Sequence, residues 1–406
     1  MSLAVGRAAM VRQSAAGSRF GAAAFVCVFP GFWLYHAFVA LGFIPPVLRG
    51  YSVAIAAMVF PLLALGYARH ASGGRASLMD AVFFTVVGAW LLFTASQFLA
   101  GATPAIVQSH LGSIPQWLSL YLIARLLDVD DPPFRLVCRI SLALMTVVVL
   151  TNLSAGSFAL ESNTVPIEER VSVATYQDFA LIYLTTALFC AIQLRATVAR
   201  AWLYSLAIAV LFMIGARTEF AAVLVAVVIL EWCLARRRAA IVVLTLLFAL
   251  IVGLVLQVLI EVSPENRVVE LITRPSDDSS VQERLFMLES ALRTIENNPL
   301  SGNFASYPPG EYAHNVLSAW VDLGLAGLLV FAFLLIAPLM DLLRQFRSRA
   351  REPLYALALT LLLVDVLLLL TAKFLAYGLT PLALGLYART RAPVPSAATQ
   401  GASRTT

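Results

Sequence analysis

Apolar segments long enough to cross a membrane recur along the whole chain, separated by short polar junctions. A helix needs about 20 apolar residues to cross about 30 Å of hydrocarbon, and it satisfies its own backbone hydrogen bonds in lipid. We expect twelve spans, at 20–44, 48–68, 78–100, 105–126, 135–153, 172–194, 201–216, 219–235, 239–261, 314–343, 354–375 and 377–389. The seventh and twelfth are short, so 10 to 12 spans fit the pattern. The sequence therefore predicts an all-α polytopic membrane protein.

Basic residues fall in every second junction between the expected spans. Loops retained in the cytoplasm are enriched in Arg and Lys. The basic junctions are the N-terminus, Arg69 to Arg75, Arg125 to Arg139, Arg195 to Arg200, Arg236 to Arg238, Arg344 to Arg351, and Arg389 with Arg391. The alternate junctions, including the long segment from Glu261 to Tyr312 in which acidic residues outnumber arginines, are expected in the periplasm. This alternation predicts a membrane protein with both termini in the cytoplasm.

Composition agrees with a membrane protein. Hydrophobic residues make up 60% of the chain, charged residues 13%, and the mean hydropathy is +0.86, whereas soluble domains carry about 25% charged residues. The net charge of +5 comes from arginines at the span junctions, which a bilayer explains without nucleic acid as a partner. Its cysteines lie inside apolar segments with no metal-type spacing, so we expect buried thiols and no metal site.

No separate soluble domain is visible between the spans. Residues 1–391 are expected to form one polytopic membrane domain that includes a periplasmic loop at 262–313. Residues 392–406 are rich in Pro, Ser, Ala and Thr and are expected to be a disordered cytoplasmic tail. No clean cleavage site follows the first apolar run, so we expect an uncleaved first span.

The periplasmic loop carries an amphipathic helix. Ser280 and Glu283 form a capping box, apolar residues follow at helical spacing, and Pro299 ends the pattern. Arg284 is then expected in the first turn, where free backbone donors and the helix dipole favour an anion such as pyrophosphate. The alternative is a solvated arginine that pairs with a neighbouring carboxylate such as Glu283.

Two further polar residues lie at expected helix ends on the same side of the membrane. Arg217 interrupts the alternation of basic junctions, and it either binds an anion or snorkels and pairs with Glu219. His314 begins the tenth expected span, where the helix end disfavours imidazolium and helps to keep the ring neutral, as a general base must be. A cap or an interfacial histidine is the alternative.

These residues belong to a larger pattern that resembles the signature of the bacterial O-antigen polymerase and O-antigen ligase family. The pattern consists of Arg217-Thr218, Arg284, Asn298-Pro299-Leu300-Ser301-Gly302, Ala313-His314-Asn315 and Gly324-Leu325-Ala326-Gly327. It covers Gly215 to Gly327 in detail and the remaining chain only by span count and orientation. The glycines are expected to let another helix approach closely.

The resemblance implies a GT-C-like glycosyltransferase that uses an undecaprenyl-pyrophosphate-linked glycan at the periplasmic face. Arg217 and Arg284 would hold the pyrophosphate, since guanidinium groups bind its oxygens in pairs, and His314 would activate the acceptor hydroxyl, with Asn315 beside it binding substrate. We expect no cofactor and no metal. Without a carboxylate pair suited to double displacement, transfer should invert the anomeric configuration.

Other polar residues in the spans add weaker candidates. Tyr176, Gln177 and Asp178 could bind sugar hydroxyls or hold Arg217, or they could mark an ordinary membrane boundary. Asp365 and Lys373 lie in the eleventh expected span, too far apart for direct contact, so other helices must supply their partners. His110 and Gln108 stay without an assigned role.

Polymerisation of lipid-linked repeat units is the function we favour from the sequence. Eight residues, Val316 to Leu323, separate the His-Asn pair from the first glycine, where O-antigen ligases usually have nine, and the outer loop is of modest length. A regulator of chain length would then be a further partner, besides membrane lipid. The alternatives are a ligase that transfers glycan to lipid A core or to protein, a transporter of lipid-linked glycan that would use Asp365, and a structural scaffold.

Overall fold

The computed structural model describes residues 19–45, 47–48, 51–154, 157–158, 176–235, 253, 257, 266–273 and 279–391. The expected tail at 392–406 lies outside these residues. So does the expected span at 239–261, apart from two isolated positions.

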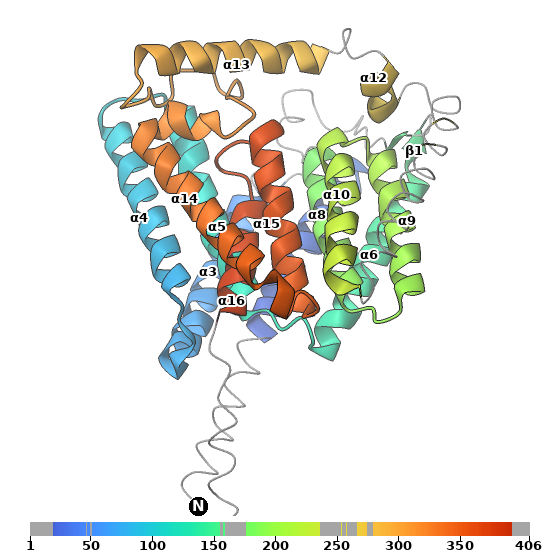
Figure 1. Ribbon diagram of the computed structural model, residues 1–406. Coiled ribbons are helices and arrows are strands. Elements are labelled where there is room, and N and C mark those ends of the chain that lie inside the picture. Colours follow the sequence, from blue (N-terminus) through green and yellow to red (C-terminus); the bar gives the residue numbers. More distant parts are fainter. Residues whose placement is uncertain are drawn as a thin grey trace, which may run out of the picture.

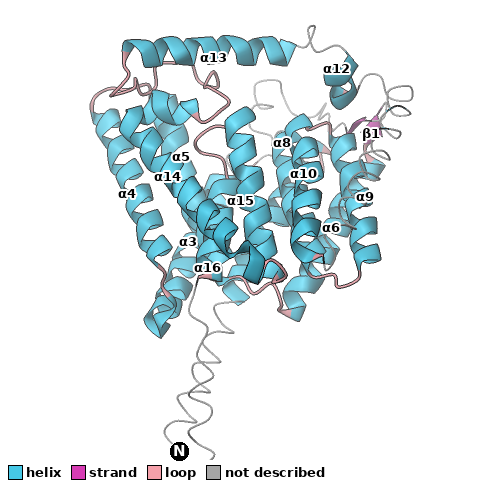
Figure 2. Ribbon diagram, viewed as in Figure 1, coloured by secondary structure: helices cyan, strands magenta, loops and turns pink. Residues whose placement is uncertain are grey.

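The described part of the chain is a bundle of helices (Figures 1 and 2). The first helical segment, Arg19–Ala40, contains a π-helical turn, η1 (Cys27–Gly31), around Pro30 and continues as α2 (Phe32–Ala40). It is followed by α3 (Tyr51–His70), η2 (Ala71–Arg75), α4 (Leu78–Leu99), α5 (Pro104–Leu126), α6 (Pro132–Thr151), α8 (Tyr176–Ile192), α9 (Thr197–Ile214), α10 (Arg217–Leu234), α12 (Arg267–Thr273), α13 (Ser279–Asn297), α14 (Leu317–Arg349), α15 (Pro353–Thr371) and α16 (Leu379–Thr390). Two short antiparallel strands, β1 (Leu153–Ser154) and β2 (Ser157–Phe158), follow α6.

Helices coincide with eleven of the twelve expected spans within the described residues. Seven of them are long and apolar enough to cross a membrane, namely Arg19–Ala40, Tyr51–Arg75, Leu78–Leu99, Pro132–Thr151, Thr197–Ile214, Leu317–Arg349 and Pro353–Thr371. Tyr176–Ile192 is a shorter apolar helix. The chain is thus a helical, multi-pass membrane protein, and the total of twelve spans stays a prediction.

Within the described residues, several of the junctions expected on the cytoplasmic side meet at one end of the bundle. Arg125 donates from Nε to Asp80 Oδ1 at 2.7 Å, and Tyr121 donates to the same oxygen at 2.6 Å. Arg389 lies 3.3 Å from Asp128 nearby, while α12 and α13 lie at the opposite end (Figure 1). The alternation of basic junctions therefore matches two opposite faces of the structure.

Helix α13 lies crosswise over the outer end of the bundle, above α14 (Figure 1). Its buried face consists of Ala291 and Ile295, which pack with Ala313 and Val321. The amphipathic helix predicted for the outer loop is therefore present, although it begins before the position that the capping box indicates.

The turn Asn298-Pro299-Leu300-Ser301-Gly302 is packed against a break in α14. Gly302 and Gly324 both adopt positive φ angles, 65° and 70°, which side chains disfavour. Leu325 donates its backbone N–H to Leu300 O at 3.1 Å, and Asn303 donates to Val321 O at 2.7 Å. The expectation that the glycines admit another helix is wrong for Gly324, because a turn of the outer loop occupies that place.

Candidate functional site

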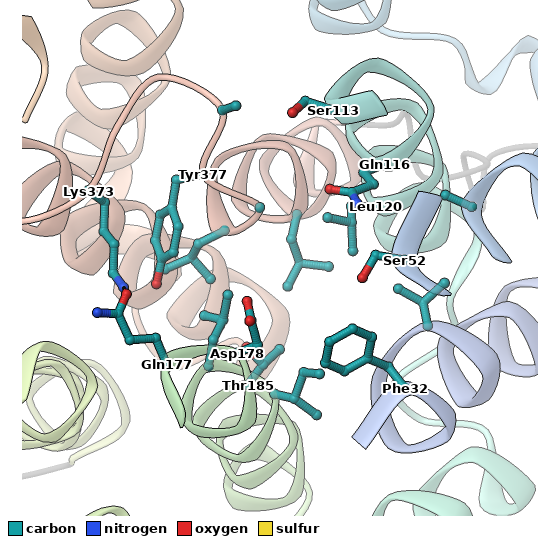
Figure 3. Close-up of a pocket in the computed structure, with 18 of the residues that line it drawn as sticks. Phe32, Ser52, Ser113, Gln116, Leu120, Gln177, Asp178, Thr185, Lys373 and Tyr377 are labelled. Carbon is teal, nitrogen blue, oxygen red and sulfur yellow. Dashed lines mark hydrogen bonds between the residues drawn. The ribbon is translucent and has the colours of Figure 1, made fainter. Parts of the chain in front are cut away.

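A cavity of about 380 Å³ opens beside His314. Its walls come from the first helical segment and from α3, α5, α8 and α16, together with the loops before α14 and after α15. The polar side chains that line it are Ser52, Ser113, Gln116, Ser119, Gln177, Asp178, Thr185, Tyr312, His314, Lys373 and Tyr377. Figure 3 labels most of these polar residues, among them Gln116, Asp178 and Lys373. Segments far apart in the sequence thus form one pocket, in which these polar groups lie beside apolar side chains such as Phe29, Leu181 and Leu382.

His314 lies three residues before α14, in the wall of this cavity. Its ring centroid is 4.8 Å from that of Tyr312, which in turn packs 4.2 Å from Phe374. Burial lowers the pKa of His314 to about 4, and the positive charges of Arg284 and Lys373 act in the same direction. Burial and the two cations thus favour the neutral ring that a general base requires.

Asn315 anchors the segment that carries His314. Its Oδ1 accepts from the backbone N–H of Leu317 at 3.0 Å at the start of α14, and its carbonyl accepts from the Ser318 hydroxyl at 2.9 Å. The same hydroxyl accepts from the backbone N–H of Leu375 at 2.9 Å. Asn315 is absent from the cavity wall, so its contacts are those of a cap, and its predicted substrate role stays a prediction.

Arg284 is the sixth residue of α13, half-buried, and does not line the cavity. The expected position in the first turn is therefore wrong, because α13 already includes Ser279. Its positive charge nevertheless contributes to the lowered pKa of His314, and it partly offsets the burial that raises the pKa of Tyr312. Arg284 is thus within electrostatic range of His314, although the two lie on different segments.

Arg217 opens α10, and its Nη2 lies 3.3 Å from Oε2 of Glu270 on α12. The neighbouring Glu219 is fully buried and pairs with the ammonium of Lys373 at 2.6 Å. Lys373 also donates to Gln177 Oε1 at 2.9 Å. Through these contacts the start of α10, which Arg217 occupies, is tied to the cavity wall, although Arg217 itself does not line it.

The predicted trio on α8 is only partly brought into the site. Gln177 and Asp178 line the cavity, whereas Tyr176 does not. Figure 3 shows the Gln177 amide meeting the end of Lys373, with Asp178 pointing into the open space.

Two charged residues that had no assigned partners have them in the structure. Lys373 is paired as described, and Asp365 Oδ1 accepts from the Thr380 hydroxyl at 3.1 Å within the bundle. The expectation that other helices supply these partners is confirmed, because Glu219 lies on α10 and Thr380 on α16.

His110 belongs to a buried network beside the cavity. Trp90 donates to His110 Nδ1 at 3.2 Å, and His110 Nε2 faces Asp322 Oδ2 at 3.4 Å. Tyr307 of the outer loop donates to the same Asp322 oxygen at 2.9 Å. The network fixes the outer loop to α4, α5 and α14.

Several lining residues carry no signal in the sequence. Ser52, Gln116, Thr185 and Tyr377 are single polar residues in separate apolar segments, and only the fold brings them together. Lys373, like Gln177, Asp178 and His314, did stand out, since a charge in an apolar segment indicates a buried partner or a functional cavity.

Comparison with protein families gives one match relevant to this site. The model described as O-antigen ligase matches residues 202–332, a segment that includes Arg217, Arg284 and His314. The match confirms the resemblance seen in the sequence. Comparison with curated proteins gave no match.

Proposed function

We propose that this chain, a multi-pass membrane protein with an O-antigen ligase family domain at residues 202–332, polymerises undecaprenyl-pyrophosphate-linked oligosaccharide repeat units. The reaction would take place at the periplasmic face of the bacterial inner membrane, on a GT-C-like arrangement of about twelve spans. The product class would be O-antigen, capsule or exopolysaccharide.

The observation that carries the proposal is the position of His314 in the cavity wall, held neutral and near Arg284. A neutral imidazole can accept a proton from a sugar hydroxyl. In the proposed step that oxygen forms a bond to the anomeric carbon of the donor glycan while the bond from this carbon to the pyrophosphate oxygen breaks. The proton moves to His314, and the electron pair leaves with undecaprenyl pyrophosphate.

Arg284 and Arg217 are proposed to bind the leaving pyrophosphate. Each guanidinium can donate two hydrogen bonds to phosphate oxygens and offset the charge that develops there. Arg217 would exchange Glu270, its exposed partner at 3.3 Å, for the pyrophosphate. We propose that these two arginines stabilise the leaving group without a metal ion.

Transfer is proposed to invert the anomeric configuration. A hydroxyl that attacks directly displaces the pyrophosphate from the opposite face, whereas retention needs a second carboxylate to form a covalent intermediate. Asp178 is the carboxylate that lines the described cavity. A product that retains the donor configuration would contradict direct attack.

Ligation of the glycan to lipid A core or to protein is the second candidate, since the matching family model is described as O-antigen ligase. The eight-residue spacing from Val316 to Leu323 supports polymerisation instead. A transporter of lipid-linked glycan, which would use the buried Asp365, is the more distant candidate, since the family match points to glycan transfer.

The test uses purified protein in nanodiscs with lipid-pyrophosphate-linked repeat units and a chelator. We expect a ladder of multiples for the wild type and none for His314→Ala, because no base remains to accept the hydroxyl proton. His70→Ala is the control. His70 ends α3, whose other end carries the cavity residue Ser52, so this change should leave the ladder intact.

A normal ladder from His314→Ala would contradict the proposed role of this residue. Transfer that occurs only after lipid A core is added would make the protein a ligase. Loss of the ladder when the chelator is added would contradict a mechanism without metal.

A further inference from the structure

Two buried hydroxyls in the cavity wall have no hydrogen-bond partner among the described residues. They are Thr185 Oγ1 on α8 and the phenol oxygen of Tyr377 in the loop after α15. Thr185 is 1% exposed and Tyr377 is 6% exposed. Buried hydroxyls in folded proteins are nearly always paired, so two unpaired hydroxyls on residues that line one cavity suit a ligand that hydrogen-bonds.

Further hydrogen-bonding groups face the same space from other helices. Figure 3 shows Gln116 of α5 and Asp178 of α8 pointing into the cavity from different sides. Ser52 of α3 lines it as well. Amide, carboxylate and hydroxyl groups together offer both donors and acceptors, which is the pattern that a polyhydroxylated ligand requires.

We propose that this cavity binds the terminal sugar of the acceptor glycan, with Thr185, Tyr377, Gln116 and Asp178 as its hydrogen-bonding partners. The proposal rests on the proposed function, because it assigns the acceptor to the side of His314 that faces the cavity. A cavity of about 380 Å³ lies in the range of small-ligand sites.

The charge of the cavity favours a neutral sugar over the donor pyrophosphate. Arg217 and Arg284 are absent from its wall, and the cation that lines it, Lys373, is paired with the buried Glu219 at 2.6 Å. The Asp178 carboxylate would repel a pyrophosphate. The donor head group is therefore better placed at the arginines, and the acceptor in the cavity.

The two unpaired hydroxyls also disfavour the polyprenyl chain of the donor, although apolar side chains such as Phe29, Leu181 and Leu382 line the same cavity. A hydrocarbon tail offers no hydrogen bond, so it would leave the hydroxyls of Thr185 and Tyr377 unpaired in a buried place. A sugar pairs both. His314, in the same wall, would then meet a hydroxyl of the bound sugar.

The experiment measures binding without turnover. The probe is the oligosaccharide released from the lipid-linked repeat unit by mild acid, which has neither pyrophosphate nor lipid. Binding to the protein in nanodiscs is followed by saturation-transfer NMR, for the wild type, Tyr377→Phe and Thr185→Val. We expect each variant to raise the dissociation constant about threefold to tenfold, the effect of one lost hydrogen bond.

Tyr183→Phe is the matched control. It also removes a buried hydroxyl from α8, but this hydroxyl is already bonded to Thr146 at 2.7 Å and does not line the cavity. We expect it to leave the dissociation constant unchanged. Size-exclusion profiles and melting curves identify variants that fail to fold, and Gln116→Leu then tests the same site from α5.

The outcomes separate this inference from the proposed function. Weaker binding of the oligosaccharide by the cavity variants supports the acceptor site. If the wild type binds the oligosaccharide but transfers no glycan, only the proposed polymerase function is contradicted. No binding of the free oligosaccharide, or equal binding by all variants, would overturn the inference while leaving transfer intact. If undecaprenyl phosphate displaces the bound oligosaccharide, the inference is overturned and the cavity is assigned to the lipid chain.

Discussion

The chemistry of His314 is controlled by its neighbours. Burial, Arg284 and Lys373 bring its pKa to about 4, so the free protein keeps a neutral ring down to acidic pH. A bound pyrophosphate would bring negative charge close to the ring and offset the two cations. The base would therefore become stronger once the donor is in place.

We therefore predict that kcat/KM and kcat fall at different pH values on the acid side. For transfer, kcat/KM should stay level from neutral pH and fall as the pH drops through about 4, because only then does the free enzyme lose its neutral His314. The profile of kcat, which reports the substrate complex, should fall at a higher pH. Initial rates between pH 3.5 and 8 measure both.

Lys373→Met supplies a check on this prediction. It removes one of the two cations, so the pKa of His314 and the acid limb of kcat/KM should move upward. An acid limb near 6.5, the ordinary histidine value, in wild-type kcat/KM would show that the ring is not controlled in this way.

Candidate site residues could be recognised in the sequence where a motif carries them, but not where only the fold brings them together. Arg284, His314 and Arg217 stand out because they are polar residues in an otherwise apolar pattern. Thr185 and Tyr377 do not, since a threonine or a tyrosine in an apolar helix is ordinary. Asn315 lies in the motif, yet its contacts with Leu317 indicate a cap.

At the level of elements, the contact between the outer turn and α14 holds the site in place. The Leu300 carbonyl accepts from Leu325 where Gly324 interrupts the helix. His314 and Asn315 lie on the same segment of chain, and eight residues separate Asn315 from Gly324. The position of the base therefore depends on how closely two glycines allow the two backbones to approach.

Gly302→Ala should loosen this contact and lower both transfer activity and melting temperature. An added Cβ would lie 2.5 Å from Val321 O and 2.6 Å from Trp320 O, too close for any real contact. Since backbone would have to move, we expect a loss of several kcal/mol in the free energy of unfolding, roughly 2 to 4. Activity assays and thermal unfolding in detergent measure the two effects.

Gly310→Ala is the control for backbone strain. Gly310 also has a positive φ angle, 93°, but a Cβ there would meet no atom within 4 Å. It should cost about 1 kcal/mol for the strain alone. Equal losses from the two variants would show that the close approach at Gly302 is unimportant.

Helix positions were largely predictable because apolar length governs them. Most of the expected spans begin and end within a few residues of the observed helices. The start of α13 was not predictable in this way, because a capping box gives a local preference that the neighbouring contacts can override. The break at Gly324 was also missed, since a glycine pair in a span usually indicates helix packing.

On the scale of the whole molecule, the two ends of the bundle should face opposite compartments. Ser301→Cys, in the outer turn, should react with a membrane-impermeant maleimide in intact cells, whereas Ser348→Cys, near the end of α14, should react only after the cells are opened. Both serines are exposed. The native cysteines are buried or half-buried and give little background.

Labelling of Ser348→Cys in intact cells, with Ser301→Cys protected, would reverse the predicted orientation. It would also place His314 and Arg284 in the cytoplasm, and a periplasmic polymerase would be excluded. The sequence predicts the alternation because arginines mark the junctions, but it leaves the packing of one span against another undetermined.

The segment that matches the family model and the walls of the cavity are largely different parts of the chain. His314 and Tyr312 are the lining residues that fall within 202–332, while Ser52, Gln116 and Asp178 come from helices before it and Tyr377 from the loop beyond it. Mutations in these flanking helices could therefore change the preferred sugar without disturbing the reacting groups. Related proteins could diversify their polysaccharides in this way, and chimeras that exchange only the flanking helices should inherit the sugar preference of the donor parent.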